Sequence, residues 1–272
     1  KKQLAQYKKQ GSLKQRIEQA KTFGNHKIKP SLRASAQKYL TKSKNKITSA
    51  TSSMALLGDD ISPRNTGMAT KGEIKIFTLL LAFSDSPPPE HQTVDVIYNH
   101  IHGEGDPARY PNESLTNFYQ RSSYDQLTIT GDVLEWYTAP KPREDYPESD
   151  IIKEALAYHA EQGVDFSQYD NDNDGVIDYF SVIWTGEVGE WATQWWGHQS
   201  GLYDSSFILS NKTFGTYSWQ ALSYNNAEDD FNPRTLIHET GHALGLPDYY
   251  DYDIEVGPAV EMPVNDMMKN NA

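Results

Sequence analysis

At 272 residues, the chain is long enough to bury a substantial hydrophobic core, as one large domain or two ordinary ones. It contains no cysteine, which excludes a disulfide scaffold and any cysteine-ligated metal. Its main apolar stretch, residues 75–84, is too short to span a bilayer, and its net charge of −12 averages two very different segments.

The first fifty residues are strongly basic, with fourteen Lys and Arg against one acid, whereas the rest holds eleven basic and thirty-six acidic residues. We expect residues 1–50 to be mainly helical or flexible, and the Ser-, Thr-, Gly- and Pro-rich residues 51–72 to be a linker. The basic segment suits either binding to nucleic acid or an anionic surface, or a propeptide lying across an acidic domain. Aromatic residues are scarce among its lysines, whereas nucleic-acid binding usually interleaves the two, so we favour the propeptide.

The body of the chain is predicted from its apolar periodicity. The continuous apolar run of residues 73–85 predicts a buried strand, and residues 125–138 alternate as a strand does. Helical spacing predicts helices at 111–123 and 149–162. A further buried strand is predicted at 177–186, near the centre of a sheet. Strands and helices alternate, which indicates an α/β or α+β body.

An acidic loop precedes the last of these strands, with the sequence DNDNDGVID at 170–178. Oxygen ligands at loop positions 1, 3, 5, 7 and 9, with glycine at 6, describe a calcium site. Position 12 is Ser181 rather than Glu, so the loop is not a complete EF-hand, and the alternative is an acidic turn without a metal. The predicted ligands are the side chains of Asp170, Asp172, Asp174 and Asp178 and the carbonyl of Val176.

The segment NPRTLIHETGHALG, residues 232–245, predicts a helix that opens with an Asn N-cap and a Pro and ends at Gly245. Residues i and i+4 share one helix face, so His238 and His242 can bind a single metal ion. Glu239 is close enough to reach a metal-bound water without ligating the metal. Zinc lowers the pKa of such a water to about 7, so that a neighbouring carboxylate can take its proton.

The residues after the second histidine favour a metal site over an ordinary buried helix that contains two histidines. Gly245 ends the helix sharply, and Asp248, three residues further on, can return to the same metal. The full pattern is His-Glu-x-x-His-x-x-Gly-x-x-Asp. Two imidazoles, one carboxylate and an open position make a catalytic zinc site, whereas a structural zinc site is closed by four protein ligands. The sequence therefore predicts a zinc hydrolase.

Three residues are candidates for stabilising an oxyanion or contacting a substrate. His198 lies in the segment WWGHQS and either lines the cleft or is simply a polar residue beside aromatics. Tyr249 and Tyr250 closely follow the third predicted ligand and suit the same task. The sequence alone does not choose among the three.

The segment HETGHALGLPDYYDYD resembles the active-site segment of the immune inhibitor A family of secreted bacterial metallopeptidases. Other segments match that family in kind and order, so the resemblance covers roughly residues 73–270; they are FTLLLAFSD, FYQRSSYDQLTITGDVLEWYTAP and DFSQYDNDNDGVIDYFSVIWTG. It implies an α+β, metzincin-like (zincin) domain over residues 73–272, with a twisted mixed sheet, an active-site helix and a preceding propeptide. It also implies that His238, His242 and Asp248 ligate zinc and that Glu239 is the general base.

Families of this type have a methionine-containing turn below the zinc. The last nine residues, VNDMMKNNA, supply it, with Met268 at the best-matching position; otherwise the two methionines are core residues. The sequence stops four residues after Met268, where the family continues with a helix under the site. We therefore expect the domain to be incomplete at its C-terminal end, and the chain, which begins at Lys1 without an initiator Met, to be a mature form or an excised part.

We predict the proform, or N-terminal part, of a secreted or cell-surface bacterial zinc metalloendopeptidase. It is expected to be a monomer that cleaves proteins or peptides, with zinc as catalytic cofactor, calcium as structural cofactor, no nucleic-acid partner and no membrane span. The alternative is a non-catalytic, calcium-stabilised surface-binding protein that retains a zincin-like body. Zinc content and casein or gelatin cleavage, with and without a chelator, distinguish the two.

Overall fold

The structure is a computed structural model that describes residues 68–109, 113–189, 194–223, 231–248 and 267–268. The predicted basic segment and most of the predicted linker lie outside these residues. Five strands are described: β1 (Gly72–Phe83), β2 (Leu127–Ala139), β3 (Val176–Trp184), β4 (His198–Gly201) and β5 (Thr213–Ala221). The α-helices described are α4 (Val94–Ile101), α5 (Leu115–Ser122), α6 (Glu148–Glu161) and α7 (Arg234–Ala243), with short 3-10 turns η1 (Pro107–Arg109), η2 (Arg143–Asp145) and η3 (Phe166–Tyr169).

The strands form one mixed sheet in the order β2-β1-β3-β5-β4. The strands β2, β1, β3 and β5 run parallel to one another, whereas β4 pairs antiparallel with β5 at the edge of the sheet. The described part of the chain is thus an α+β fold, and the predicted central place of the strand at 177–186 is confirmed by β3.

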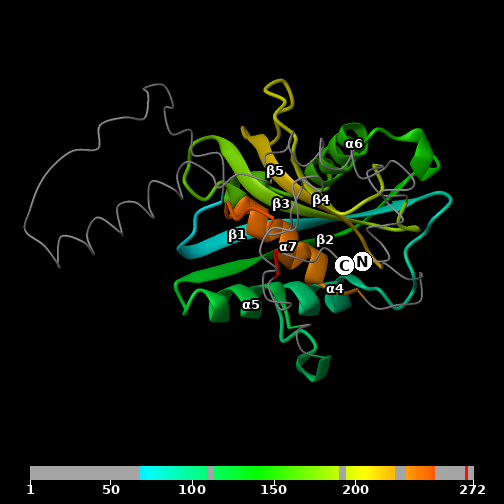
Figure 1. Cartoon of the computed structure of the whole chain (residues 1–272). Helices are drawn as coiled ribbons and strands as arrows, with labels where there is room; N and C mark the ends of the chain where they lie inside the picture. The colour runs from blue at the N-terminus through cyan, green and yellow to red at the C-terminus, as the bar shows by residue number, and fades with distance from the viewer. Residues whose placement is uncertain (1–67, 110–112, 190–193, 224–230, 249–266, 269–272) are drawn as a thin grey trace, which may run out of the picture.

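Helices cover both faces of the sheet: in Figure 1, α6 lies above it and α4 and α5 lie below it. The alternation of β1 explains this, because Phe77 and Leu79 enter the core on the α6 side while Ile76 and Leu80 enter the core shared with α4, α5 and α7. A parallel strand buried on both faces needs apolar residues at successive positions. The unbroken apolar run of β1 meets that need.

The predicted strands and helices up to β3 are confirmed within a few residues, but three of the strands and α-helices that the structure describes were not predicted. These are α4, the four-residue strand β4 and the strand β5. Of the helices described, none is long and apolar enough to cross a membrane.

Candidate metal centre

The local sequence of α7 sets its two ends. Asn232 Oδ1 accepts the backbone N–H of Arg234 across 3.0 Å, but the helix begins one residue later than predicted, so that Pro233 holds the N-cap position. At the other end Gly245 has a φ of +93°, which L side chains rarely adopt. The N–H of Leu246 donates to the Gly241 carbonyl and that of Gly245 to the His242 carbonyl, both across 2.9 Å. This Gly-dependent cap turns the chain back toward the helix.

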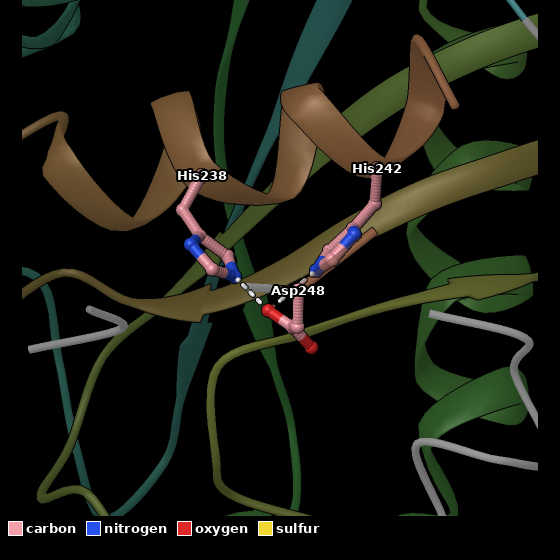
Figure 2. A group of neighbouring side chains, drawn as sticks. All are labelled: His238, His242 and Asp248. Carbon is pink, nitrogen blue, oxygen red and sulfur yellow. Dashed lines mark ion pairs between the residues drawn. The ribbon is translucent and has the colours of Figure 1, made fainter. Parts of the chain in front are cut away.

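The turn brings the three predicted ligands together. Figure 2 shows the rings of His238 and His242 projecting from one side of α7 toward the carboxylate of Asp248. Asp248 Oδ1 lies 3.0 Å from His238 Nε2 and 3.4 Å from His242 Nε2. All three side chains are at most 2 % exposed.

The other nitrogen of each imidazole is held by a backbone carbonyl. His238 Nδ1 lies 2.7 Å from the Met267 oxygen, and His242 Nδ1 lies 2.8 Å from the Leu246 oxygen. A carbonyl only accepts hydrogen bonds, so each Nδ1 carries the hydrogen. In a neutral ring this leaves Nε2 with its lone pair directed at the common point, the tautomer that a metal ligand requires.

The charge balance of the cluster fits a cation. Burial opposes protonation of His238, but Asp248 and Glu239 outweigh it and raise the pKa of this imidazole. Burial likewise opposes ionisation of Asp248, but the two histidines hold the pKa of its carboxyl well below the ordinary value. Neither Nε2 has a hydrogen-bond partner among the described residues. Two imidazole nitrogens and a carboxylate oxygen, buried and convergent, are a donor set that suits zinc.

Glu239 lies beside this cluster and makes a long ion-pair contact with it. Its side chain is fully buried, and its Oε2 is 3.9 Å from His242 Nε2. Neither carboxylate oxygen has a hydrogen-bond partner within the described ranges. A buried carboxylate with both oxygens free of donors is costly to maintain, and such groups gather at functional sites.

Met267 and Met268 pack directly on α7. A Cβ added to Gly241 would lie 2.6 Å from Met268 Sδ and 2.8 Å from Met267 Cε, so the absence of a side chain there permits this approach. Met268 is buried, and the carbonyl of Met267 holds His238. The two methionines therefore lie against the helix turn that carries both histidines.

His198 lies on the other face of the sheet. Its register partner in β5, Trp219, belongs to the core on the α6 side. Its Nε2 lies 3.0 Å from Glu148 Oε1 and its Nδ1 lies 2.8 Å from the Trp196 oxygen. This arrangement favours the reading of His198 as a polar residue beside aromatics. Tyr249 and Tyr250 lie outside the described residues.

Carboxylate oxygens also converge in the acidic loop, where N–H groups and an ammonium of the protein donate hydrogen bonds to them. Carboxylate oxygens of Asp170, Asp172 and Asp174 lie within 4.8 Å of one another. Asp170 Oδ2 accepts the ammonium of Lys212 across 2.7 Å and the N–H of Gly175 across 3.0 Å. Asp178 stands slightly apart, and its Oδ2 is 3.4 Å from the Asn171 backbone nitrogen. No sequence pattern pointed to Lys212, because it lies 42 residues beyond Asp170.

The chain has clear relatives among known proteins. Residues 63–262 match the family described as immune inhibitor A peptidase M6, catalytic domain. The chain is 28% identical over 180 residues to Immune inhibitor A of Bacillus thuringiensis subsp. alesti, covering 52% of this chain and 26% of that protein. It is 25% identical over 229 residues to Pre-pro-metalloprotease PrtV of Vibrio cholerae serotype O1 strain M66-2, covering 65% of this chain and 25% of that protein. The chain thus spans about a quarter of the length of these relatives.

Proposed function

Because the chain belongs to the immune inhibitor A family of M6 peptidases, as its zinc motif predicted, we propose that it is a zinc-dependent metalloendopeptidase with a metzincin-like catalytic domain. The observation that carries the proposal is the convergence of His238 Nε2, His242 Nε2 and Asp248 Oδ1, with Glu239 buried beside them. These three residues would hold the zinc ion. When bound, zinc supplies Lewis acidity, which lowers the pKa of a coordinated water and polarises a peptide carbonyl.

Glu239 is the general base in this proposal. Its carboxylate takes the proton of the attacking water and delivers it to the leaving amine, which a carboxylate free of other donors is suited to do. Burial excludes bulk water from the site and strengthens each electrostatic contact there. The carbonyls of Met267 and Leu246 keep both imidazoles in the ligating tautomer, and Met268 forms the turn beneath them.

The natural substrates are proteins or peptides, and the peptidase domain comprises residues 73–272. We further propose that residues 1–50 are a propeptide, joined by the linker 51–72, and that the protein is a secreted or cell-surface bacterial protein that acts as a monomer. The opposite charges of the two segments support latency, and the name of the Vibrio relative, a pre-pro-metalloprotease, supports processing. Tyr249 or Tyr250 is the proposed donor to the oxyanion, and the loop from Asp170 to Asp178, including the Val176 carbonyl, is a structural calcium site.

The test is Glu239→Gln, which keeps the size of the side chain and removes the base. We expect bound zinc to stay near one per chain while casein cleavage falls by about 100-fold or more. Chelation should abolish cleavage in the parent chain, and added zinc should restore it. Zinc binding without any cleavage in the parent chain would instead favour a non-catalytic surface-binding protein, and full activity in Glu239→Gln would exclude the role given to this carboxylate.

A further inference from the structure

Two buried tyrosines from distant parts of the fold contact α7 on either side of His238 and Glu239. Tyr119 in α5 donates its hydroxyl hydrogen to the Ile237 carbonyl across 2.6 Å. The hydroxyl oxygen of Tyr179 in β3 lies 2.9 Å from Thr240 Oγ1, a hydrogen bond between the two hydroxyl groups. Residues 237 and 240 flank the first candidate ligand and the candidate base. The two hydroxyls therefore hold the helix turn that carries both.

Both phenols are reliable hydrogen-bonding groups. Burial raises the pKa of Tyr119 and of Tyr179 well above the ordinary value, and the charge of Glu239 raises both further. Each hydroxyl therefore keeps its hydrogen at neutral pH and can donate it.

The sheet beneath α7 carries a row of buried hydroxyl groups. Thr78 of β1 pairs in register with Ser181 of β3, which pairs with Ser218 of β5, and all three are fully buried. Thr78 Oγ1 lies 2.7 Å from Ser181 Oγ. Their neighbours along each strand belong to the core on the α6 side, so this row lies on the face that α4, α5 and α7 cover. An apolar interface tolerates small shifts of a helix, whereas the directional contacts that Tyr119 and Tyr179 make with α7 specify one position.

We propose that Tyr119 and Tyr179 are positioning residues that fix the Glu239 carboxylate relative to the metal ligands. They do so by holding the Ile237 carbonyl and the Thr240 hydroxyl, so that the helix turn between them, which carries Glu239, does not deform. A catalytic group must stay within about 0.5 Å and 10–20° of its productive geometry, so the loss of one contact suffices to lower turnover. This inference rests on the proposed function, because it depends on the role given to Glu239.

The first experiment compares Tyr119→Phe and Tyr179→Phe with Tyr169→Phe in the full chain. Tyr169 is the matched control, since it is also buried and donates to Asp132 Oδ2 across 2.8 Å, but packs in the core on the α6 side. All three variants should lose similar thermal stability. Only Tyr119→Phe and Tyr179→Phe should lower kcat, by about five- to tenfold each, the factor expected for one ordinary hydrogen bond, with KM and zinc content unchanged.

A second measurement needs neither metal nor activity. Hydrogen exchange of the backbone amides of residues 238–242 in metal-free protein should quicken in Tyr119→Phe and Tyr179→Phe relative to Tyr169→Phe at matched global stability. A parent chain that binds zinc but cleaves nothing would overturn the proposed function, and the exchange rates would still decide whether the tyrosines hold α7.

A double-mutant cycle then asks whether the tyrosines act through Glu239. In the Glu239→Gln background, Tyr179→Phe should have no further effect on residual turnover, because the group that it positions is already gone. An undiminished five- to tenfold loss in that background overturns the proposal. So do kcat values for Tyr119→Phe and Tyr179→Phe that equal that of Tyr169→Phe.

Discussion

Two clusters in this molecule bring potential metal ligands within reach of one another, and they differ in burial. The cluster of His238, His242 and Asp248 is buried throughout, whereas in the cluster of Asp170, Asp172 and Asp174 only the first residue is buried. In both clusters the candidate ligand atoms lie within 4.8 Å of one another. Proximity alone therefore does not distinguish them.

The clusters also differ in what balances their charge. In the loop, backbone N–H groups donate to Asp170, Asp172 and Asp174, and the ammonium of Lys212 sits on Asp170. In the buried cluster the backbone contacts are made by the Nδ1 atoms, which leaves both Nε2 atoms facing Asp248. The loop supplies its own donors, but the buried cluster requires a proton or a metal ion. We therefore expect metal loss to abolish function at the first cluster and only to lower stability at the second.

The largest expected effect is that of His242→Ala, which tests the dependence of the buried cluster on metal. Two remaining ligands hold zinc weakly, so bound zinc should fall from about one per chain to near zero and cleavage should be lost. The measurement is metal analysis of dialysed protein at neutral pH, together with casein cleavage.

The matched control is His159→Ala, which removes a buried histidine of α6 on the other face of the sheet. It should cost stability but leave zinc in place. Undiminished zinc in His242→Ala would mean that the metal is held elsewhere, and the contrast between the two clusters would then be wrong.

The buried cluster was largely predictable because its geometry is local. Helix periodicity aligns His238 with His242, and the left-handed turn at Gly245 returns Asp248 within a few residues. The groups that support it are not local: Tyr119 lies 118 residues from Ile237, and Tyr179 lies 61 residues from Thr240. No sequence pattern joins such pairs, because each contact exists only once the sheet and helices have packed.

The strands missed by the sequence analysis have a related cause. Sequence patterns assign alternate polar residues to solvent, but in β5 the polar residues Thr216, Ser218 and Gln220 are buried. Residues 216–221 do alternate polar and apolar side chains, the usual signal of a half-exposed strand, but the strand is internal and its polar face is covered. β4 spans only four residues, too few for a periodicity to be recognised.

A smaller effect is expected at the acidic loop, where calcium should stabilise without taking part in the reaction. Binding to the folded state alone contributes about 2.7 kcal/mol at a hundredfold excess over Kd, so millimolar calcium should raise the Tm of metal-stripped protein by several degrees. Asp172→Ala combined with Asp174→Ala should abolish this rise while zinc binding persists. An unchanged Tm in the parent chain would mean that the loop is an acidic turn only.

The smallest expected effect concerns Lys212, which stands where a cation would contact Asp170. Although burial opposes it, the ammonium of Lys212 and the N–H of Gly175 hold the pKa of Asp170 below its ordinary value. In Lys212→Met the carboxylate keeps its backbone donors but loses its counter-charge. The calcium-free Tm should therefore fall by about 2–4 °C, which corresponds to roughly 1 kcal/mol in a domain of this size.

Calcium should restore the Tm of Lys212→Met, because in this variant the ion no longer competes with an ammonium for Asp170. The calcium concentration at half of the Tm rise should thus be lower in Lys212→Met than in the parent chain. Lys153→Met is the matched control: Lys153 pairs across 2.6 Å with Asp204, which is not a candidate calcium ligand, so its loss should lower the Tm equally with and without calcium. If the two variants respond alike to calcium, Lys212 does not occupy the position of a cation. The difference between the loop and the buried cluster would then not arise from the ammonium of Lys212.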